Sequence, residues 1–412
     1  MSKILSKGDC FGGLTAAVVA LPLALAFGVA SGAGALAGLY GAILVGFFAA
    51  IFGGTASQIS GPTGPMTVIM TVIVAHFSAS PATAFVVVLC SGILQIAFGF
   101  LGIGQLIKLV PYPVVSGFMT GIGCIIVILQ IPAFLGHSSS GDGIVATLFS
   151  ISEIAATPSS QAIILGLLAL LISFFTPKFI CRFCPPLLIA LFVGTLFAYF
   201  LTPGVEVIGA IPSGLPSLSM PEVVRGDILI IFKFALILAL LGSIDSLLTS
   251  LVADEMTGTK HDSNKELVGQ GIGNMFAGLV GGLPGAGATM RTVTNIRSGG
   301  TSRASGALHA IVLLAIMLGF GGIVAYVPLA VLAGILFNVG INIVDWKFIA
   351  RIHVVRKTSL LIMLSTLLVT IFIDLITAVA LGCCLTSIFF YGRGAKGKKL
   401  YKDYSEFIES FK

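Results

Sequence analysis

The stretch SGPTGPMT at residues 60–67 interrupts an apolar chain with two glycines and two prolines, and it decides how the chain folds. A second stretch, GAGATMRT at residues 285–292, again places glycines and a threonine before a helix-forming run. Glycine permits non-helical backbone, and Pro65 suits the first turn of a helix. Each stretch therefore predicts a break in the backbone followed by a short half-helix.

The composition around these breaks is that of a chain embedded in a bilayer. Hydrophobic residues make up 57% of the 412 residues and charged residues only 9%, with a mean hydropathy of +1.11. Soluble domains carry about 25% charged residues, so a water-soluble protein is excluded, and so is a disordered one. The net charge of +6 does not indicate nucleic-acid binding, because the Lys and Arg residues lie in short loops and in the tail.

The apolar segments predict an all-α polytopic membrane protein with about fourteen transmembrane segments. A helix needs about 20 apolar residues to cross a bilayer, although half-length helices occur inside transporters. The candidate segments are 11–29, 36–52, 66–77, 82–101, 113–135, a weak one at 144–155, 162–175, 186–201, 228–252, 267–283, 290–296, 304–320, 327–339, 360–372 and 375–391.

The basic residues give an independent test of this count. If the N-terminus is cytoplasmic, fourteen alternating spans place the 22 Lys and Arg residues on the cytoplasmic side of the membrane. The exceptions are Arg225, Lys233 and Arg291. Cytoplasmic loops carry such an excess of positive charge. We therefore expect the protein to lie in the inner membrane of a bacterium, with both termini in the cytoplasm.

Fourteen spans divide into two repeats of seven, and an odd repeat unit must be inverted. We expect one transport domain at residues 1–391, with the first repeat at about 1–201 and the second at about 228–391. The polar linker 202–227 separates them, and residues 392–412 form a cytoplasmic tail. The two breaks then occupy the third place of each repeat, where broken helices mark a transporter's binding site.

The breaks have the chemistry of an anion site. Thr63 is positioned to cap the first half-helix, and the free N–H groups of a helix start carry a positive dipole end. Two half-helices that meet at their N-termini attract an anion, and the small Gly287 and Ala288 leave room for contacts with backbone amides. The alternative is that both breaks are tight turns in a glycine-rich bundle.

Two ionisable residues lie near the breaks. Asp245 falls at about mid-depth of its span, and Thr249 shares its helical face one turn later. Arg291 follows Thr289 at the start of the second half-helix. Asp245 and Arg291 form a structural ion pair in one interpretation. In the other, Asp245 binds a cation or proton and Arg291 attracts the anion.

The remaining polar residues indicate little chemistry. The mixed-charge segment 254–266 is expected to be a solvated cytoplasmic loop. The chain has no phosphate-binding GxxxxGK[ST] motif and no GxSxG nucleophile elbow, so neither ATP drive nor an enzyme is predicted.

The chain resembles the SulP family of inorganic anion transporters. The resemblance is carried by GGLTAA at 12–17, ALPLALAFG at 20–28, GLY at 38–40, and the runs 59–67 and 281–300 with Asn295 and SGG at 298–300. It extends over the whole apolar part of the chain. It implies a uracil-permease-like fold divided into core and gate domains, and transport by movement of the core against the gate.

Within this family the chain is most similar to the cyanobacterial sodium-dependent bicarbonate transporters. That similarity implies that Thr63, Ala288 and Thr289 contact bicarbonate. It also implies a sodium site made of Asp245, Thr249, Gly287 and Thr289. Arg291 departs from the pattern, because those carriers have a small residue there, and an arginine is able to occupy Asp245 in place of sodium. The family usually continues into a cytoplasmic STAS domain, which is expected to be absent here or truncated.

The sequence thus predicts secondary active transport of a small inorganic anion, bicarbonate with sodium. The alternatives are sulfate with a proton or sodium, and an uncoupled anion channel or exchanger, against which the buried acid Asp245 argues. A nucleobase transporter is discounted because no aromatic or carboxamide pair is evident in the lining. The expected partners are the anion and the lipid bilayer, with a homodimer left open. No cofactor is expected apart from Na⁺ as coupling ion.

Overall fold

The computed structural model describes residues 6–105, 111–137, 143–181, 184–202, 204–209, 227–353, 355–373 and 375–391. The tail at 392–412 and most of the linker at 202–227 lie outside these ranges.

The described chain is almost entirely helical. The first half contains α1 (Lys7–Ala30), α2 (Ala35–Phe52), β1 (Ser60–Gly61), α3 (Gly64–His76), α4 (Pro81–Phe100), α5 (Tyr112–Leu135), α6 (Gly143–Ile154), α7 (Ser160–Phe175), α8 (Lys178–Cys181) and α9 (Pro186–Leu201). The second half contains α10 (Ile228–Thr257), α11 (Ser263–Leu279), β2 (Ala286–Gly287), α12 (Thr289–Arg297), α13 (Arg303–Val324), α14 (Leu329–Ile343), α15 (Trp346–Ala350), α16 (Lys357–Phe372) and α17 (Leu375–Tyr391). Within the described ranges, α1, α2, α4, α5 and α10 are long and apolar enough to cross a membrane by length and composition.

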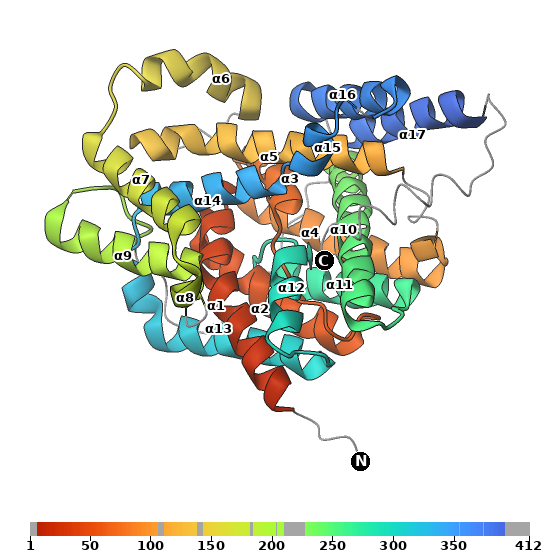
Figure 1. Ribbon diagram of the computed structural model, residues 1–412, viewed down its shortest axis with the longest axis horizontal. Helices are drawn as coiled ribbons and strands as arrows, with labels where there is room; N and C mark the ends of the chain where they lie inside the picture. The colour runs from red at the N-terminus through yellow and green to blue at the C-terminus, as the bar shows by residue number, and fades with distance from the viewer. Residues whose placement is uncertain are drawn as a thin grey trace.

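The helices pack as two sets related by an approximate internal repeat. α4 packs against α10 and α11, and α13 packs in the same way against α1 and α2. α16 and α17 lie along α5 as α7 and α9 lie along α14 (Figure 1). Matching the contacts pairs α1–α5, α7 and α9 with α10–α14, α16 and α17. Each set has seven helices, so the second repeat is inverted relative to the first.

Helix α6 corresponds in position only to the short connecting helix α15, since α6 lies between α5 and α7 and α15 lies between α14 and α16. Helix α6 packs mainly on α5 and lies at the edge of the molecule in Figure 1. Its 12 residues reach only about 18 Å, too short to cross a bilayer. The weak candidate segment at 144–155 is therefore not one of the fourteen transmembrane segments, and the short connecting helices α8 and α15 are not either.

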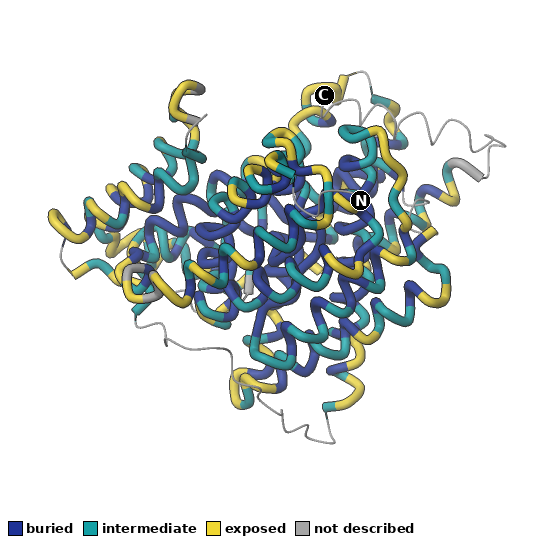
Figure 2. The backbone as a smooth tube through the Cα atoms, turned by 90° about the horizontal axis from the view of Figure 1, so that it is seen from below, coloured by how far each residue is buried: buried dark blue, intermediate teal, exposed yellow. Residues whose placement is uncertain are grey.

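The fourteen segments form two packing groups, which correspond to the expected core and gate domains. The core contains α1–α4 and α10–α13, and the gate contains α5, α7, α9, α14, α16 and α17. They meet where α1 packs on α9 and α14 and where α3 packs on α5. Buried residues are concentrated in the middle of the molecule, and exposed residues lie at its periphery, as Figure 2 shows.

The two breaks lie side by side in the core. β1 and β2 pair antiparallel, with Ser60 opposite Gly287 and Gly61 opposite Ala286. Gly61 has φ +150°, and a Cβ there would lie 2.8 Å from Nη1 of Arg291. Position 61 therefore requires glycine. The crossing of β1 and β2 brings together the starts of α3 and α12, which are more than 200 positions apart in the sequence.

Candidate functional site between the two half-helices

Helices α3 and α12 both begin at this crossing without a side-chain cap. Thr63 is the N-cap residue of α3 and Ala288 that of α12, and neither side chain accepts a hydrogen bond from the first turn. The prediction that Thr63 occupies the cap position is correct, but its hydroxyl does not cap the helix. Neither side chain therefore satisfies the first-turn N–H groups of the two half-helices.

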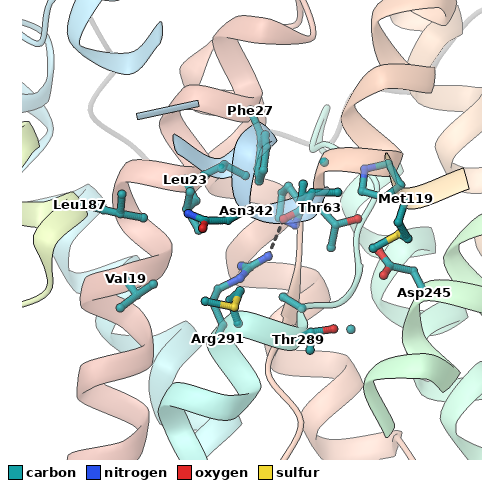
Figure 3. A pocket seen from close by; sticks show the side chains of 18 of the residues that line it. Val19, Leu23, Phe27, Thr63, Met119, Leu187, Asp245, Thr289, Arg291 and Asn342 are labelled. Carbon is teal, nitrogen blue, oxygen red and sulfur yellow. Dashed lines mark hydrogen bonds between the residues drawn. The ribbon is translucent and has the colours of Figure 1, made fainter. Parts of the chain in front are cut away.

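A cavity of about 160 Å³ lies at these helix starts (Figure 3). One water needs roughly 10–15 Å³ of such volume, whereas sites for drug-sized ligands enclose about 300–1,000 Å³, so this cavity suits a small ion with a few waters. Both domains line it. The lining includes Thr63, Gly287, Ala288, Thr289, Asp245 and Arg291 from the core, and Met119, Leu187, Asn338 and Asn342 from the gate.

Oxygen atoms suited to a hard cation gather on the α10 side. The Thr249 hydroxyl donates to the carbonyl oxygen of Gly287 at 3.0 Å and lies 2.8 Å from the hydroxyl of Thr289. Asp245, one turn before Thr249 on α10, lines the cavity and is 7% exposed. The fold thus brings together all four residues of the expected cation site.

The Asp245 carboxyl is held in the cavity wall with one oxygen unsatisfied. Its Oδ2 makes no hydrogen bond of normal geometry among the described residues, and neither does the hydroxyl of Thr63, although the two side chains lie close enough to interact with each other. Buried polar atoms are normally hydrogen-bonded, and exceptions cluster where a ligand or water binds. Both unsatisfied atoms belong to side chains that the sequence had selected.

Arg291 is buried at 2% exposure, and its guanidinium reaches across to the other half-helix. Its Nη2 donates to the carbonyl oxygen of Pro62, as the dashed line in Figure 3 shows, and Nη1 has no partner within the described chain. No ion pair joins Arg291 to Asp245 in the described residues. The ion-pair interpretation is therefore wrong for this conformation, since the guanidinium is held by backbone instead.

The site thus consists of two helix starts without side-chain caps, the buried guanidinium of Arg291 and the buried carboxyl of Asp245, all around one small cavity. A sequence profile described as the Sulfate permease family matches residues 7–366. The chain belongs to the sulfate permease family.

Individual family members agree with this assignment. The bicarbonate transporter BicA of Picosynechococcus is 50% identical over 395 residues, which cover 93% of this chain and 69% of that protein. The putative sulfate transporter YvdB of Bacillus subtilis is 36% identical over 400 residues, covering 95% of this chain and 75% of that protein. The solved transmembrane domain of a cyanobacterium BicA matches with a TM-score of 0.86 at 50% identity, covering 90% of this chain and 97% of that domain. The family resemblance expected from the sequence is confirmed.

Glu266 shows where the sequence interpretation failed. The segment 254–266 was expected to be a solvated loop, but Glu266 lies in α11 at 1% exposure. Its carboxylate accepts hydrogen bonds from the backbone N–H of Gly54 and Thr55, at 2.9 and 2.8 Å, and from the side chains of Gln58 and Gln270, at 2.7 and 2.8 Å. The three bonds from Gly54, Thr55 and Gln58 hold the extended segment that leads to β1, and the fourth comes from α11 itself. The expectation was wrong because the donors come from a distant part of the chain.

Gln58 links this carboxylate to the cavity wall. A Cβ at Gly287 would lie only 2.4 Å from Nε2 of Gln58, so the Gln58 side chain packs directly on the backbone of Gly287. Its Oε1 also accepts a hydrogen bond from Ser250, the residue after Thr249, at 3.0 Å. The Glu266 network therefore positions both half-helix segments.

The gate side of the cavity was not predicted from the sequence. Asn338 and Asn342 lie one turn apart on α14, and both line the cavity together with Phe27. The prediction that no carboxamide pair lines the cavity, which argued against a nucleobase as ligand, is therefore wrong. The small cavity and the family membership now argue against that ligand instead. Two carboxamides at i and i+4 in an apolar helix were the signal available in the sequence.

Proposed function

We propose that this protein is a secondary active transporter that carries a small inorganic anion, bicarbonate, together with Na⁺. One observation supports this most directly: a buried acid, Asp245, and a buried cation, Arg291, face the same small cavity without forming an ion pair. A site that keeps both charges apart has a place for a partner of each.

The anion would lie between the starts of α3 and α12. Helix N-termini favour negative charge through free N–H groups and the helix dipole. The Thr63 hydroxyl adds an unsatisfied donor, and Arg291 adds a full positive charge. Ala288 is small enough to let the ligand approach the backbone.

The cation would lie beside Asp245 on the α10 side. Carboxylate, hydroxyl and carbonyl oxygens are the ligands of hard cations, and Asp245, Thr249, Thr289 and the carbonyl of Gly287 supply this set. Na⁺ at Asp245 would offset the negative charge next to the anion, so each ion would favour binding of the other. A simple anion channel would gain nothing from Asp245.

Transport would follow from the division into two domains. The half-helices belong to the core, whereas the opposite wall of the cavity belongs to the gate. Movement of the core against the gate would carry the ions from one face of the membrane to the other. We place both termini in the cytoplasm of a bacterium, because this orientation puts most Lys and Arg residues inside.

Sulfate is the second candidate, and Arg291 is the observation that favours it. A divalent anion gains more from a buried guanidinium than a monovalent one does. The 36% identical relative from Bacillus subtilis is named a putative sulfate transporter.

Uptake into liposomes tests these proposals. The purified protein is reconstituted, and uptake of labelled bicarbonate, sulfate and chloride is measured with and without an inward Na⁺ gradient. We expect Na⁺-dependent bicarbonate uptake that is lost in Ala288→Leu, whose three added carbon atoms would fill the space between the half-helices. Uptake of sulfate in preference to bicarbonate would show that sulfate, and not bicarbonate, is the substrate. Equal uptake with and without any cation gradient would contradict coupled transport, and normal uptake by Ala288→Leu would exclude this cavity.

A further inference from the structure

We propose that Asn338, on gate helix α14, is an anion-binding residue: its side-chain amide donates a hydrogen bond across the cavity and makes the site selective for oxyanions. This inference rests on the proposed function, since it takes the cavity between α3 and α12 as the anion site.

The gate side of the cavity is apolar apart from two asparagines. Among its lining residues, Met119, Leu187, Val339 and Ile343 offer no hydrogen bond, and Asn338 and Asn342 are the only polar side chains. Asn338 is 6% exposed, although it lies within a helix whose only other polar side chain is Asn342. Burying a carboxamide in such a wall is unfavourable unless its donors and acceptor are satisfied.

The neighbouring asparagine sets the orientation of this carboxamide. Nδ2 of Asn342 donates to Oδ1 of Asn338 at 2.9 Å, one helical turn away. The acceptor end of Asn338 is therefore satisfied within the helix. Its Nδ2 group makes no hydrogen bond to another described residue, and so Asn338 presents a donor, rather than an acceptor, to the cavity.

A donor from the gate completes the site on the opposite side from the core. The half-helix N–H groups, Thr63 and Arg291 all approach the ligand from the core. A ligand that engages these and Asn338 at once needs acceptor atoms on two sides. Bicarbonate and sulfate have several oxygens, whereas chloride is a single centre without directed acceptors.

The same geometry makes this contact sensitive to the transport cycle. The core donors would travel with the anion, whereas Asn338 stays on the gate. Its hydrogen bond to the anion can form only in the relative position of core and gate that this structure shows. The bond therefore favours anion binding in this conformation over the other conformations of the transport cycle.

The experiment compares anion binding and uptake for four variants of the full chain. Asn338→Leu removes the donor, Asn338→Asp replaces it with an acceptor of negative charge, and Asn342→Leu removes the orienting bond. Thr195→Val is the control, because Thr195 lies on gate helix α9 outside the cavity lining and its hydroxyl bonds Leu191 within its own helix. Binding is followed by the rise in thermal unfolding midpoint with added bicarbonate, sulfate or chloride.

A hydrogen bond to a charged ligand predicts a loss of roughly ten- to a hundredfold in oxyanion affinity for Asn338→Leu. We expect a larger loss for Asn338→Asp, a smaller one for Asn342→Leu, and no change for Thr195→Val. Chloride binding should change less than bicarbonate or sulfate binding in Asn338→Leu.

The outcomes separate the two proposals. Unchanged oxyanion affinity in a folded Asn338→Leu protein that still transports would overturn this inference and leave the proposed function intact. Equal losses for chloride and oxyanions would overturn the selectivity. If the unaltered protein binds oxyanions but does not transport them, the proposed function fails, while the loss in Asn338→Leu still supports this contact. If it binds none of the three anions, both proposals fail.

Discussion

Arg291 on the second half-helix donates a hydrogen bond to the carbonyl oxygen of Pro62, the residue before the N-cap of the first half-helix. Each broken segment therefore depends on the other, and the positive charge is fixed beside the cavity without a direct ion pair to Asp245. This arrangement leaves Asp245 available to a cation and Arg291 available to an anion.

Asp245→Asn should abolish cation-dependent uptake while the protein stays folded. The amide keeps the shape of the side chain but removes the charge that a hard cation requires. Uptake is measured against the Na⁺ gradient and against pH, and folding by the thermal unfolding midpoint. Asp254→Asn is the control, because Asp254 lies on the same helix but bonds His261 at 2.7 Å outside the cavity lining. Full sodium or pH dependence in Asp245→Asn would exclude Asp245 as the coupling residue.

Arg291→Gln should weaken anion binding and leave cation binding intact or stronger. The substitution removes a buried positive charge beside both ions, which attracts the anion and repels the cation. We expect the half-saturating anion concentration to rise at least tenfold, with an unchanged or lower half-saturating Na⁺ concentration. Arg297→Gln, at the exposed end of the same helix, serves as the control. A higher Na⁺ requirement in Arg291→Gln would show that Arg291 does not act on the cation in this way.

Thr63→Val and Thr289→Val should each raise the half-saturating anion concentration. A hydrogen bond from a neutral donor to a charged group contributes about 1.5–3 kcal/mol, so the expected rise for Thr63→Val is roughly ten- to a hundredfold. The rise should be smaller for Thr289→Val, because Thr249 donates its proton to Gly287 and so receives that of Thr289. Thr15→Val is the reference, since the Thr15 hydroxyl bonds Phe11 on an exposed face of α1. If Thr15→Val has an effect of equal size, the change does not report on the anion site.

The two threonines should differ in their effect on sodium. The Thr63 hydroxyl is unsatisfied, whereas that of Thr289 bonds Thr249 at 2.8 Å. Thr289→Val should therefore also raise the half-saturating Na⁺ concentration, and Thr63→Val should do so less. The two Na⁺ titrations, run at saturating anion, give the comparison, and identical curves would contradict a shared role for Thr289.

Glu266→Gln should lower stability and impair uptake together. The carboxylate accepts four hydrogen bonds from N–H groups. In the glutamine variant an NH₂ group would replace one carboxylate oxygen, and it cannot accept from those N–H groups. Leaving buried donors unsatisfied costs about 1–3 kcal/mol each, so the unfolding midpoint should fall clearly. Glu153→Gln on the exposed face of α6 controls for loss of charge. An unchanged midpoint in Glu266→Gln would mean that the network does not hold the segment.

Local features of the sequence were sufficient to predict several parts of this site. Thr63 and Ala288 stand at helix starts because glycines and a proline end one conformation and begin another within a few residues. Asp245 and Thr249 share a face because they are four residues apart in one helix. Such relationships depend only on neighbouring residues.

Other parts depended on contacts between distant segments. Glu266 was misinterpreted because its charged neighbours indicated a loop, whereas its partners Gly54 and Thr55 lie more than 200 residues away. Asn338 and Asn342 were overlooked because nothing within α14 shows which of its faces meets the half-helices. The Arg291–Asp245 pair was considered on proximity alone, and the carbonyl of Pro62 was not considered as a competing partner.

The sequence by itself determined that this chain is a membrane protein, that it contains two broken helices, and which core residues lie at the breaks. Hydropathy, glycine and proline act locally, so their consequences can be read from one segment at a time. The tertiary structure alone decided that Arg291 bonds Pro62 instead of Asp245, that Glu266 is buried, and that the gate presents Asn338 to the cavity. Those outcomes depend on which donors and acceptors the packing of distant helices brings within reach of one another, and no local pattern encodes that choice.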